Sequence, residues 1–422
     1  MTHPLQTLVA RHRAGDRRGI TSVCSAHPAV IEAALRLGAR TGETVLIEAT
    51  CNQVNQDGGY TGMTPADFRR FVLEIAGRVG LDPGRVILGG DHLGPNPWKD
   101  LPAEAAMAKA ETMIAAYAEA GFTKLHLDTS MGCAGEPAAL ADAETAARAA
   151  RLARVAEAAE SAADPVYVIG TEVPVPGGAT HALSDLAVTT PQAAGATYQV
   201  HAEAFRAAGL EAAFSRVIGL VVQPGVEFGH SDVVRYDAAK ARALSAALDG
   251  LPGAVFEAHS TDYQTPEALR ALVGDGFAIL KVGPWLTFAL REALYALDAV
   301  ADVLNGTPPQ GRLMAEMDQV MQAAPRHWTS HYGGTAQEQW LMRHFSLSDR
   351  IRYYWPEPAA ERAVTRVAER LRDRPCPAPV LAQFLPWAEA HAGGPLDVQD
   401  LLVAAAARVL DTYHTATHAP GA

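Results

Sequence analysis

The feature that most constrains the fold of this 422-residue chain is a regular alternation of short, β-branched apolar runs with longer alanine-rich stretches. Near-continuous runs of Val, Ile and Leu are typical of parallel strands that are covered on both faces. Eight such runs occur, at residues 20–26, 44–50, 85–92, 124–129, 166–172, 217–223, 254–260 and 277–283. The sequence therefore predicts a parallel sheet of eight strands.

Stretches of helical length separate these runs, as the crossover connections of parallel strands require. We expect helices at residues 28–37, 65–79, 103–120, 141–159, 193–213, 238–248 and 286–304. Eight strands, each followed by a helix, predict an α/β fold of the TIM (β/α)8 barrel type over residues 1–305. A doubly wound sheet is the alternative, but it usually has fewer strands and a glycine-rich loop after the first, where this chain has Cys24-Ser25-Ala26-His27.

The alternation ends at Asn305-Gly306, and proline clusters interrupt the helical patterns that follow. Helical patterns remain around Ala323 and over residues 359–372. We expect residues 306–422 to form a mostly helical C-terminal extension packed on the barrel. Within it, the aromatic segment 350–355 carries Arg350 and Arg352, and this segment reads either as an anion-binding site or as a surface strand.

Composition excludes several classes of protein. The formal net charge is −12, which argues against a general binder of nucleic-acid backbones. No run of about 18 apolar residues is present, so we expect no membrane span. Basic residues follow the first short apolar stretch, the reverse of a secretory signal, and the four cysteines form no CxxC pair. We expect reduced thiols and a cytoplasmic location.

Polar residues stand at the carboxyl ends of the predicted strands, where barrels of this type carry their chemistry. Ionisable groups inside apolar strands are costly to bury unless they are paired, hydrogen-bonded or bound to metal. The residues concerned are Glu48, Asp91, His92, His126, Asp128, Glu172, Gln223, Glu257, His259, Asp262 and Lys281. Any one histidine can be a core residue bonded to a carboxylate, but convergence of the whole set at one end indicates an active site.

The residue types in this set suit a divalent cation. We expect His92 and His259 as nitrogen ligands, with Glu172 and Gln223 as oxygen donors. Zn²⁺ is the expected ion, and Mn²⁺, Co²⁺ or Ni²⁺ are the alternatives. The candidate acid/base groups are Asp91, Asp128, Glu172 and Asp262. The sequence does not choose a pair among them.

Other polar residues near the strand ends are candidates for substrate contact. They are Glu48, Asn52, His126, Ser260, Lys281, Gly283 and Arg350. Asn52 begins a glycine-rich loop, 52–63, that reads as a lid or as a solvated loop. Lys281 is a Schiff-base nucleophile if its pKa is lowered, or else a cation that orients a substrate oxygen. Gly283 precedes a helix whose backbone N–H groups can hold an anion.

Seven segments together resemble a known family. They are GGDHLGPN (89–96), HLDTSMGCAG (126–135), GTEVPVPGG (170–178), VVQPGVEF (221–228), EAHSTDYQ (257–264), FAILKVGP (277–284) and SLSDRIRYYWP (346–356). In this order they are similar to the Z-subunit family of tagatose-bisphosphate aldolases (GatZ/KbaZ), which includes tagatose/fructose 4-epimerase-like members. The resemblance runs over nearly the whole chain.

The resemblance implies a TIM barrel related to the class II, metal-dependent ketose-bisphosphate aldolases. In that group an Asp-His pair supplies a metal ligand and an acid/base, which Asp91-His92 resembles, and His259 resembles a further metal histidine. A third metal histidine has no obvious equivalent, because strand six gives Gln223. That departure fits the usual description of the Z subunit as a non-catalytic stabiliser. Some relatives nevertheless act alone as ketose 4-epimerases.

We therefore expect a metal-dependent, ketose-converting enzyme that acts on tagatose and fructose, or on their phosphates, by C4 epimerisation or retro-aldol chemistry. The alternative is an accessory subunit that stabilises a class II tagatose-1,6-bisphosphate aldolase. We also expect a homo-oligomer, without nucleic-acid or membrane partners. Trp285 replaces the small residue that the family pattern often has there, and its bulk near an anion position favours an unphosphorylated sugar.

Overall fold

A computed structural model gives the fold of the chain and describes residues 2–161, 164–170 and 186–418. Its centre is a closed barrel of eight parallel strands. The strands are β1 (Ile20–Cys24), β2 (Val45–Thr50), β3 (Val86–Leu93), β4 (Lys124–Leu127), β5 (Val166–Gly170), β6 (Val217–Val221), β9 (Val255–Ala258) and β10 (Ile279–Val282). Every strand lies within a predicted run or extends it by one residue, so the predicted TIM barrel is confirmed.

Helices surround the barrel and alternate with its strands. They are α1 (Pro4–Arg13), α2 (Pro28–Thr41), α3 (Pro65–Val79), α4 (Ala103–Glu119), α5 (Asp142–Ala158), α6 (Pro191–Ala207), α7 (Glu211–Phe214), α8 (Ala238–Ala247), α9 (Pro266–Gly274) and α10 (Pro284–Leu304). The single helix expected over residues 193–213 is wrong, because Gly209 adopts a φ of 71° and separates α6 from α7.

The barrel interior is apolar at its amino-terminal end. Leu46, Ile87, Val166 and Ile279 pack there with other inward-facing strand residues, and α1 contributes Leu5 to the same cluster. Helix α1 therefore closes the bottom of the barrel. The polar residues gather at the opposite end. A two-stranded antiparallel ribbon of β7 (Glu227–Phe228) and β8 (Val233–Val234) lies in the connection after β6.

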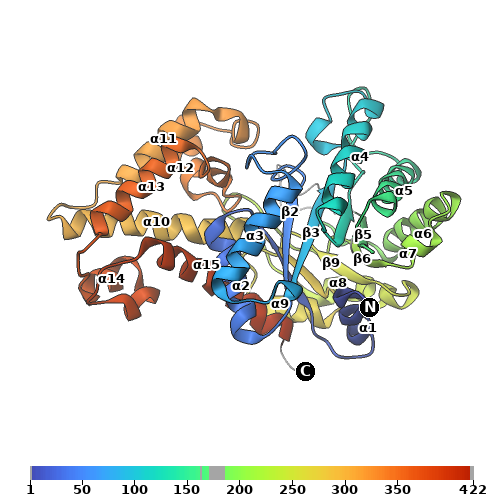
Figure 1. Cartoon of the computed structure of the whole chain (residues 1–422), viewed down its shortest axis with the longest axis horizontal. Helices are drawn as coiled ribbons and strands as arrows, with labels where there is room; N and C mark the ends of the chain where they lie inside the picture. The colour runs from blue at the N-terminus through green and yellow to red at the C-terminus, as the bar shows by residue number, and fades with distance from the viewer. Residues whose placement is uncertain (1, 162–163, 171–185, 419–422) are drawn as a thin grey trace.

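The C-terminal extension is helical and is built on α10. Its elements are α11 (Arg312–Ala323), α12 (Ala336–Phe345), the 3₁₀ helix η6 (Arg350–Tyr354), α13 (Pro358–Leu371), α14 (Ala378–Phe384) and α15 (Val398–His418). Helix α10 runs out from the barrel, and α11, α12 and α13 gather along it (Figure 1). No helix in the described part of the chain is long and apolar enough to cross a membrane.

The last helix, α15, returns to the barrel. It packs against β1 and against α2, α9 and α10. Helix α2 follows β1 and α9 precedes β10, so α15 occupies the place between them that the eighth outer helix takes in a (β/α)8 barrel. The hydroxyl of Tyr413 in α15 donates to the carbonyl of Thr261, at 2.7 Å, beyond the end of β9. The extension thus completes the helical wall of the barrel.

The expectation of a surface strand at residues 350–355 is wrong. The segment forms η6, in which Ile351 and Tyr354 are fully buried. These two side chains are three residues apart, a spacing that places them on one face of a 3₁₀ helix and on opposite faces of a strand. The hydroxyl of Tyr354 donates to the carbonyl of Ala324, at 2.6 Å, and fixes the segment against the end of α11.

If α15 is part of the barrel wall, truncating its buried face will destabilise the whole protein. Leu401 is 0% exposed, and we expect Leu401→Ala to lower the free energy of unfolding by about 2–5 kcal/mol, because it removes apolar burial and leaves a cavity. Thr415→Ala, on the exposed face of the same helix, is the control and should change it by less than about 0.5 kcal/mol. Urea unfolding measures both, and equal midpoints for the two variants would contradict the assignment.

Candidate active site

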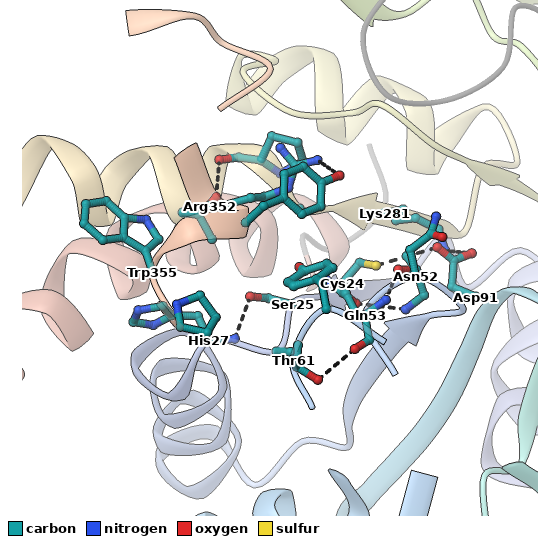
Figure 2. Close-up of a pocket in the computed structure, with 18 of the residues that line it drawn as sticks. Cys24, Ser25, His27, Asn52, Gln53, Thr61, Asp91, Lys281, Arg352 and Trp355 are labelled. Carbon is teal, nitrogen blue, oxygen red and sulfur yellow. Dashed lines mark hydrogen bonds and ion pairs between the residues drawn. The ribbon is translucent and has the colours of Figure 1, made fainter. Parts of the chain in front are cut away.

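A cavity of about 590 Å³ opens at the carboxyl ends of the strands (Figure 2). Its walls include the strand ends, the loop after β2, the segment that contains η6, and residues of the helices α10, α13 and α15. The loop contributes Asn52 and Tyr60, and the extension contributes Arg352 and Tyr353. Its volume suits a small molecule, and its lining depends on the barrel and the extension together.

Most of the residues that the sequence singled out line this cavity. They are Asn52, Asp91, His92, Asp128, His259, Ser260, Asp262, Lys281 and Gly283. Glu48 and His126 are fully buried and contact lining residues, so neither is placed to touch a substrate. Gln223 and Arg350 do not line the cavity. Glu172 lies outside the residues that the structure describes.

Three imidazole rings meet beside the cavity. His92 lies in β3, His126 lies in β4, and His259 follows β9. Their ring centroids are 4.9, 5.0 and 5.2 Å apart. Strand six, where a third metal histidine was expected, has Gln223. The structure brings His126 to the other two instead, from a strand where it was read as a substrate contact.

The contacts of His126 define its protonation. Its Nε2 lies 2.9 Å from the carbonyl oxygen of Gly170, which can only accept, so Nε2 carries the proton. The other ring nitrogen, Nδ1, accepts the backbone N–H of His92 at 3.3 Å and also lies 3.0 Å from Oδ1 of Asp91. A cation beside these two acceptors would offset their mutual repulsion. A backbone carbonyl that orients the far nitrogen is also the usual support of a metal-ligating histidine.

His92 is held in a similar way by a carboxylate. Its Nδ1 lies 2.8 Å from Oδ2 of Asp128, while Nε2 lies 3.6 Å from Oδ2 of Asp91. Burial alone would lower the pKa of His92, but Asp91 and the hydrogen bond to Asp128 raise it above its usual value. The backbone of His92 has a φ of 48°, which is uncommon for a residue with a side chain. Local strain at the end of β3 therefore helps to aim this ring.

A buried ionic network lies against the histidines. The ammonium group of Lys124 contacts Glu48 at 2.5 Å and Glu257 at 2.9 Å, and both partners are 0% exposed. Lys281 contacts Glu48 at 2.8 Å, Glu257 at 3.6 Å and Asp91. Burial would raise the pKa of Asp91, but His92 and Lys281 hold it well below its usual value. Burial acts in the same direction on Glu48 and Glu257, but Lys124 and Lys281 lower the pKa of both, so all three carboxylates are ionised.

Gly89 explains how this network crosses a strand. In the barrel register Glu48 of β2 is the neighbour of Gly89 in β3, and Gly89 is the neighbour of Lys124 in β4. A Cβ atom at Gly89 would lie 2.5 Å from Oε1 of Glu48. Only a residue without a side chain lets the glutamate and the lysine meet across the intervening strand.

The donor set fits a divalent cation. Asp91, His126, Glu257 and His259 are buried, and each offers a ligand atom within 4.8 Å of the others. The surrounding network holds three carboxylates and two ammonium groups, which leaves a net negative charge at the site. Imidazole and carboxylate donors suit Zn²⁺ and other first-row divalent ions.

Two expectations about this site are not supported by the structure. Gln223 was an expected oxygen ligand, but its Oε1 accepts the backbone N–H groups of Gly225 and Val226, at 2.8 and 2.9 Å, and so caps its own turn. Lys281 was a possible Schiff-base nucleophile, which requires a lowered pKa. Burial acts in that direction, but the carboxylates led by Asp91 raise the pKa of Lys281 well above its usual value, so the side chain is an ammonium ion.

The start of α10 does not present free N–H groups to an anion. Oδ1 of Asp262 accepts the N–H of Gly283 at 3.0 Å and that of Trp285 at 2.8 Å. The indole of Trp285 packs against Tyr263 and Tyr413 and does not line the cavity. The bulk of Trp285 therefore gives no steric reason to exclude a phosphorylated sugar.

Of the two arginines that the sequence offered in this segment, the extension places Arg352 at the cavity and not Arg350. Nε of Arg350 donates to the carbonyl of His327 instead. The RIRYYW segment contained both arginines, but only the helical phase of η6 decides which of them faces inward. Lys124 was missed for a different reason, because Glu48, its partner, lies 76 positions away in the sequence.

Breaking the buried network should be costly. We expect Lys124→Met to lower the free energy of unfolding by about 3–5 kcal/mol, because it leaves Glu48 and Glu257 without their shared cation. Lys109→Met is the matched control, since it removes an exposed ion pair with Asp57 worth at most about 1 kcal/mol. Urea titrations compare the two, and similar small losses would show that the network is not a structural requirement.

A pH dependence of stability follows from Asp262. Burial raises its pKa to about 6 from 3.8, although the N–H groups of Trp285 and Gly283 act in the opposite direction. Between pH 4 and 6 the unfolded chain has lost this proton while the folded chain retains it. The group therefore lowers the free energy of unfolding by about 3 kcal/mol as the pH rises through this window.

Asp262→Asn tests this assignment, because an amide oxygen still accepts the two N–H groups but does not titrate. The unfolding free energy of the parent, minus that of the variant, should fall between pH 4 and 6 and stay level above pH 7. Urea unfolding at several pH values measures the difference. Parallel pH profiles for the two proteins would contradict the raised pKa.

Comparison with known proteins finds relatives that match almost the whole chain. The chain is 55% identical, over 420 residues and 99% of both chains, to a protein of Agrobacterium fabrum named D-tagatose 6-phosphate 4-epimerase. A crystal structure from Sinorhizobium meliloti, described as a probable tagatose 6 phosphate kinase, is 57% identical. It superposes with a TM-score of 0.86 over 94% of this chain and 100% of that one.

A family model matches residues 5–418, which is nearly the whole chain. That family is described as D-tagatose-1,6-bisphosphate aldolase subunit GatZ/KbaZ-like. The epimerase relative and the family agree with an enzyme of the epimerase or aldolase type, in line with the expectation from the sequence. The chain belongs to the GatZ/KbaZ-like family of D-tagatose-1,6-bisphosphate aldolase subunits.

Proposed function

We propose that this chain interconverts D-tagatose 6-phosphate and D-fructose 6-phosphate by inverting the configuration at C4. The observation that carries the proposal is the 55% identity, over 99% of both chains, with the Agrobacterium relative named for this epimerisation. The buried histidines and carboxylates beside a cavity of about 590 Å³ support the same chemistry.

Retro-aldol cleavage is the route that the chemistry of a 2-ketose favours. The hydrogen on C4 is not adjacent to the carbonyl at C2, so its removal gives no stabilised carbanion. The C4 hydroxyl is β to that carbonyl, and loss of its proton allows the C3–C4 bond to break into an aldehyde and an enediolate. Rotation of the aldehyde and re-addition to its other face give the C4 epimer, and no other reactant is consumed.

In this proposal His92, His126 and His259 hold a divalent cation, with Asp91 or Glu257 as an oxygen donor. Zn²⁺ is the preferred ion. Such a cation, when bound, supplies Lewis acidity towards the ketose oxygens. The ligand rings are oriented by protein acceptors, as with Asp128 on Nδ1 of His92 and the Gly170 carbonyl on Nε2 of His126.

Proton transfer at the C4 hydroxyl is assigned to Asp262. Its Oδ1 is engaged by the start of α10, so Oδ2 is the atom that accepts and returns the proton. Burial raises its pKa to about 6, which is close to the working range of a group that alternates between acid and base. The pKa values of Asp91 and Asp128 lie below their usual range, because charged or hydrogen-bonding neighbours offset their burial, so both remain carboxylates.

A second candidate is the accessory-subunit role, because the family description names an aldolase subunit. In that case the chain would be inactive alone and would raise the activity or stability of a class II tagatose-bisphosphate aldolase when mixed with it. Assays of the purified chain, with and without such a partner, separate the two functions.

The proposed epimerase should form fructose 6-phosphate from tagatose 6-phosphate without a partner protein. We expect EDTA treatment to abolish turnover and addition of Zn²⁺, Mn²⁺, Co²⁺ or Ni²⁺ to restore it. A coupled assay for fructose 6-phosphate measures the rate, and elemental analysis measures the bound metal. Turnover that persists in protein shown to be metal-free would contradict the metal-dependent part of the proposal.

The ligand assignment predicts that His92→Ala, His126→Ala and His259→Ala each lose bound metal in parallel with activity. His391→Ala is the control, since this histidine lies in the extension and does not line the cavity. Elemental analysis of the four variants gives the result independently of turnover. Full metal content in the His126 variant would remove that residue from the ligand set.

A further inference from the structure

The guanidinium of Arg352 is a positive charge that the protein positions at the cavity without neutralising it. Its Nη1 donates to the carbonyl of Asp349 at 3.1 Å and to that of Ser348, and its Nη2 donates to the hydroxyl of Tyr353 at 3.0 Å. The side chain also lies over the ring of Tyr353, 4.5 Å from its centroid. None of these partners is a carboxylate.

The nearest carboxylate in the sequence is committed elsewhere. Oδ1 of Asp349 pairs with Nε of Arg291 at 3.2 Å, and Oδ2 accepts from the hydroxyl of Thr287 at 2.6 Å. Among the described residues no carboxylate forms an ion pair with Arg352. A cation left without a counter-ion at a cavity wall is typical of a site for an anionic ligand.

The other positive groups of the cavity are not available to an anion. His92 is paired with Asp91 and Asp128. Lys281 is surrounded by Asp91, Glu48 and Glu257, and the N–H groups at the start of α10 are occupied by Asp262. Burial lowers the pKa of His27 to about 4, so this lining residue is neutral. The position that barrels of this type often use for phosphate, after strand eight, is therefore closed by the protein's own carboxylate.

Arg352 lies across the cavity from the buried cluster. Figure 2 shows it on the side of His27 and Trp355, opposite Asp91 and Lys281. The two ends of a ketose 6-phosphate match the two sides of this cavity. Its carbonyl and its C3–C4 bond lie towards one end, and its phosphate ester lies at the other. Tyr60 of the loop after β2 meets Tyr353 edge to face, at 4.8 Å, so two phenol groups stand beside the guanidinium.

We propose that Arg352, flanked by Tyr60 and Tyr353, forms the subsite for the phosphate monoester of the substrate, so that the extension and not the barrel selects phosphorylated sugars. This inference rests on the proposed epimerase function and adds the residue that determines its substrate class. The Tyr60–Tyr353 contact also joins the barrel loop to the extension, which places this subsite where the two parts of the chain meet.

The test compares two substrates in the same protein. For Arg352→Met we expect the ratio of kcat/KM for tagatose 6-phosphate to kcat/KM for tagatose to fall about tenfold or more, chiefly through KM for the phosphate ester. Arg352→Lys keeps the charge but not the fork of donors, and should give an intermediate ratio. Arg408→Met is the matched control, because Arg408 also lies over an aromatic ring, that of Trp387, but outside the cavity.

Binding of inorganic phosphate gives a readout that does not need turnover. Trp355 lines the cavity, so tryptophan fluorescence can follow a phosphate titration of the parent and of each variant. We expect the Kd for phosphate to rise at least fivefold in Arg352→Met and to stay unchanged in Arg408→Met. If Arg352→Met does not fold, the Arg352→Lys protein serves for both measurements.

The outcomes separate this inference from the proposed function. Unchanged substrate ratios and phosphate affinities in both Arg352 variants would overturn the subsite, while epimerase activity in the parent would leave the function standing. Absence of turnover with either ketose would overturn the function, and a loss of phosphate affinity in Arg352→Met would still support an anion subsite at this wall.

Discussion

The ion pairs between Lys124 and the carboxylates of Glu48 and Glu257 are the interaction on which the candidate site depends. They lie in a fully buried layer of the barrel, where an isolated charge would cost several kcal/mol. By fixing the charge state of this layer they allow Lys281 and Asp91 to remain ionised beside three histidines. The candidate site at the strand ends thus lies on a buried ionic layer and not on an apolar core.

The C-terminal extension contributes to both the barrel wall and the cavity. One of its helices, α15, fills the gap in the barrel wall, while η6 brings Arg352 and Tyr353 to the cavity. The same C-terminal segment therefore contributes to stability and to the cavity wall. In the proposed function the barrel supplies the groups for bond cleavage, and the extension supplies the wall that faces the phosphate end of the substrate.

The sequence predicted the regular parts of this molecule well, because parallel strands and their helices leave a periodic pattern. It also predicted His92 and His259 at the site, since polar residues at strand ends are rare. It assigned His126 to substrate contact and missed Lys124, because their roles depend on side chains that only barrel closure brings near. The sequence could not separate Arg350 from Arg352, because residues two apart share a face in a strand but lie on different faces of the 3₁₀ helix that forms here.

The position of α15 has a consequence for how the protein is made. Helices α2 and α15 are neighbours in the barrel wall, yet nearly the whole chain separates them. During synthesis the apolar face of α2 must wait, on the order of tens of seconds, for a partner that is made more than 350 residues later. Such a long-range contact slows folding and leaves an apolar surface of the nascent chain exposed. A nascent chain of this kind is a natural client of chaperones until α15 docks.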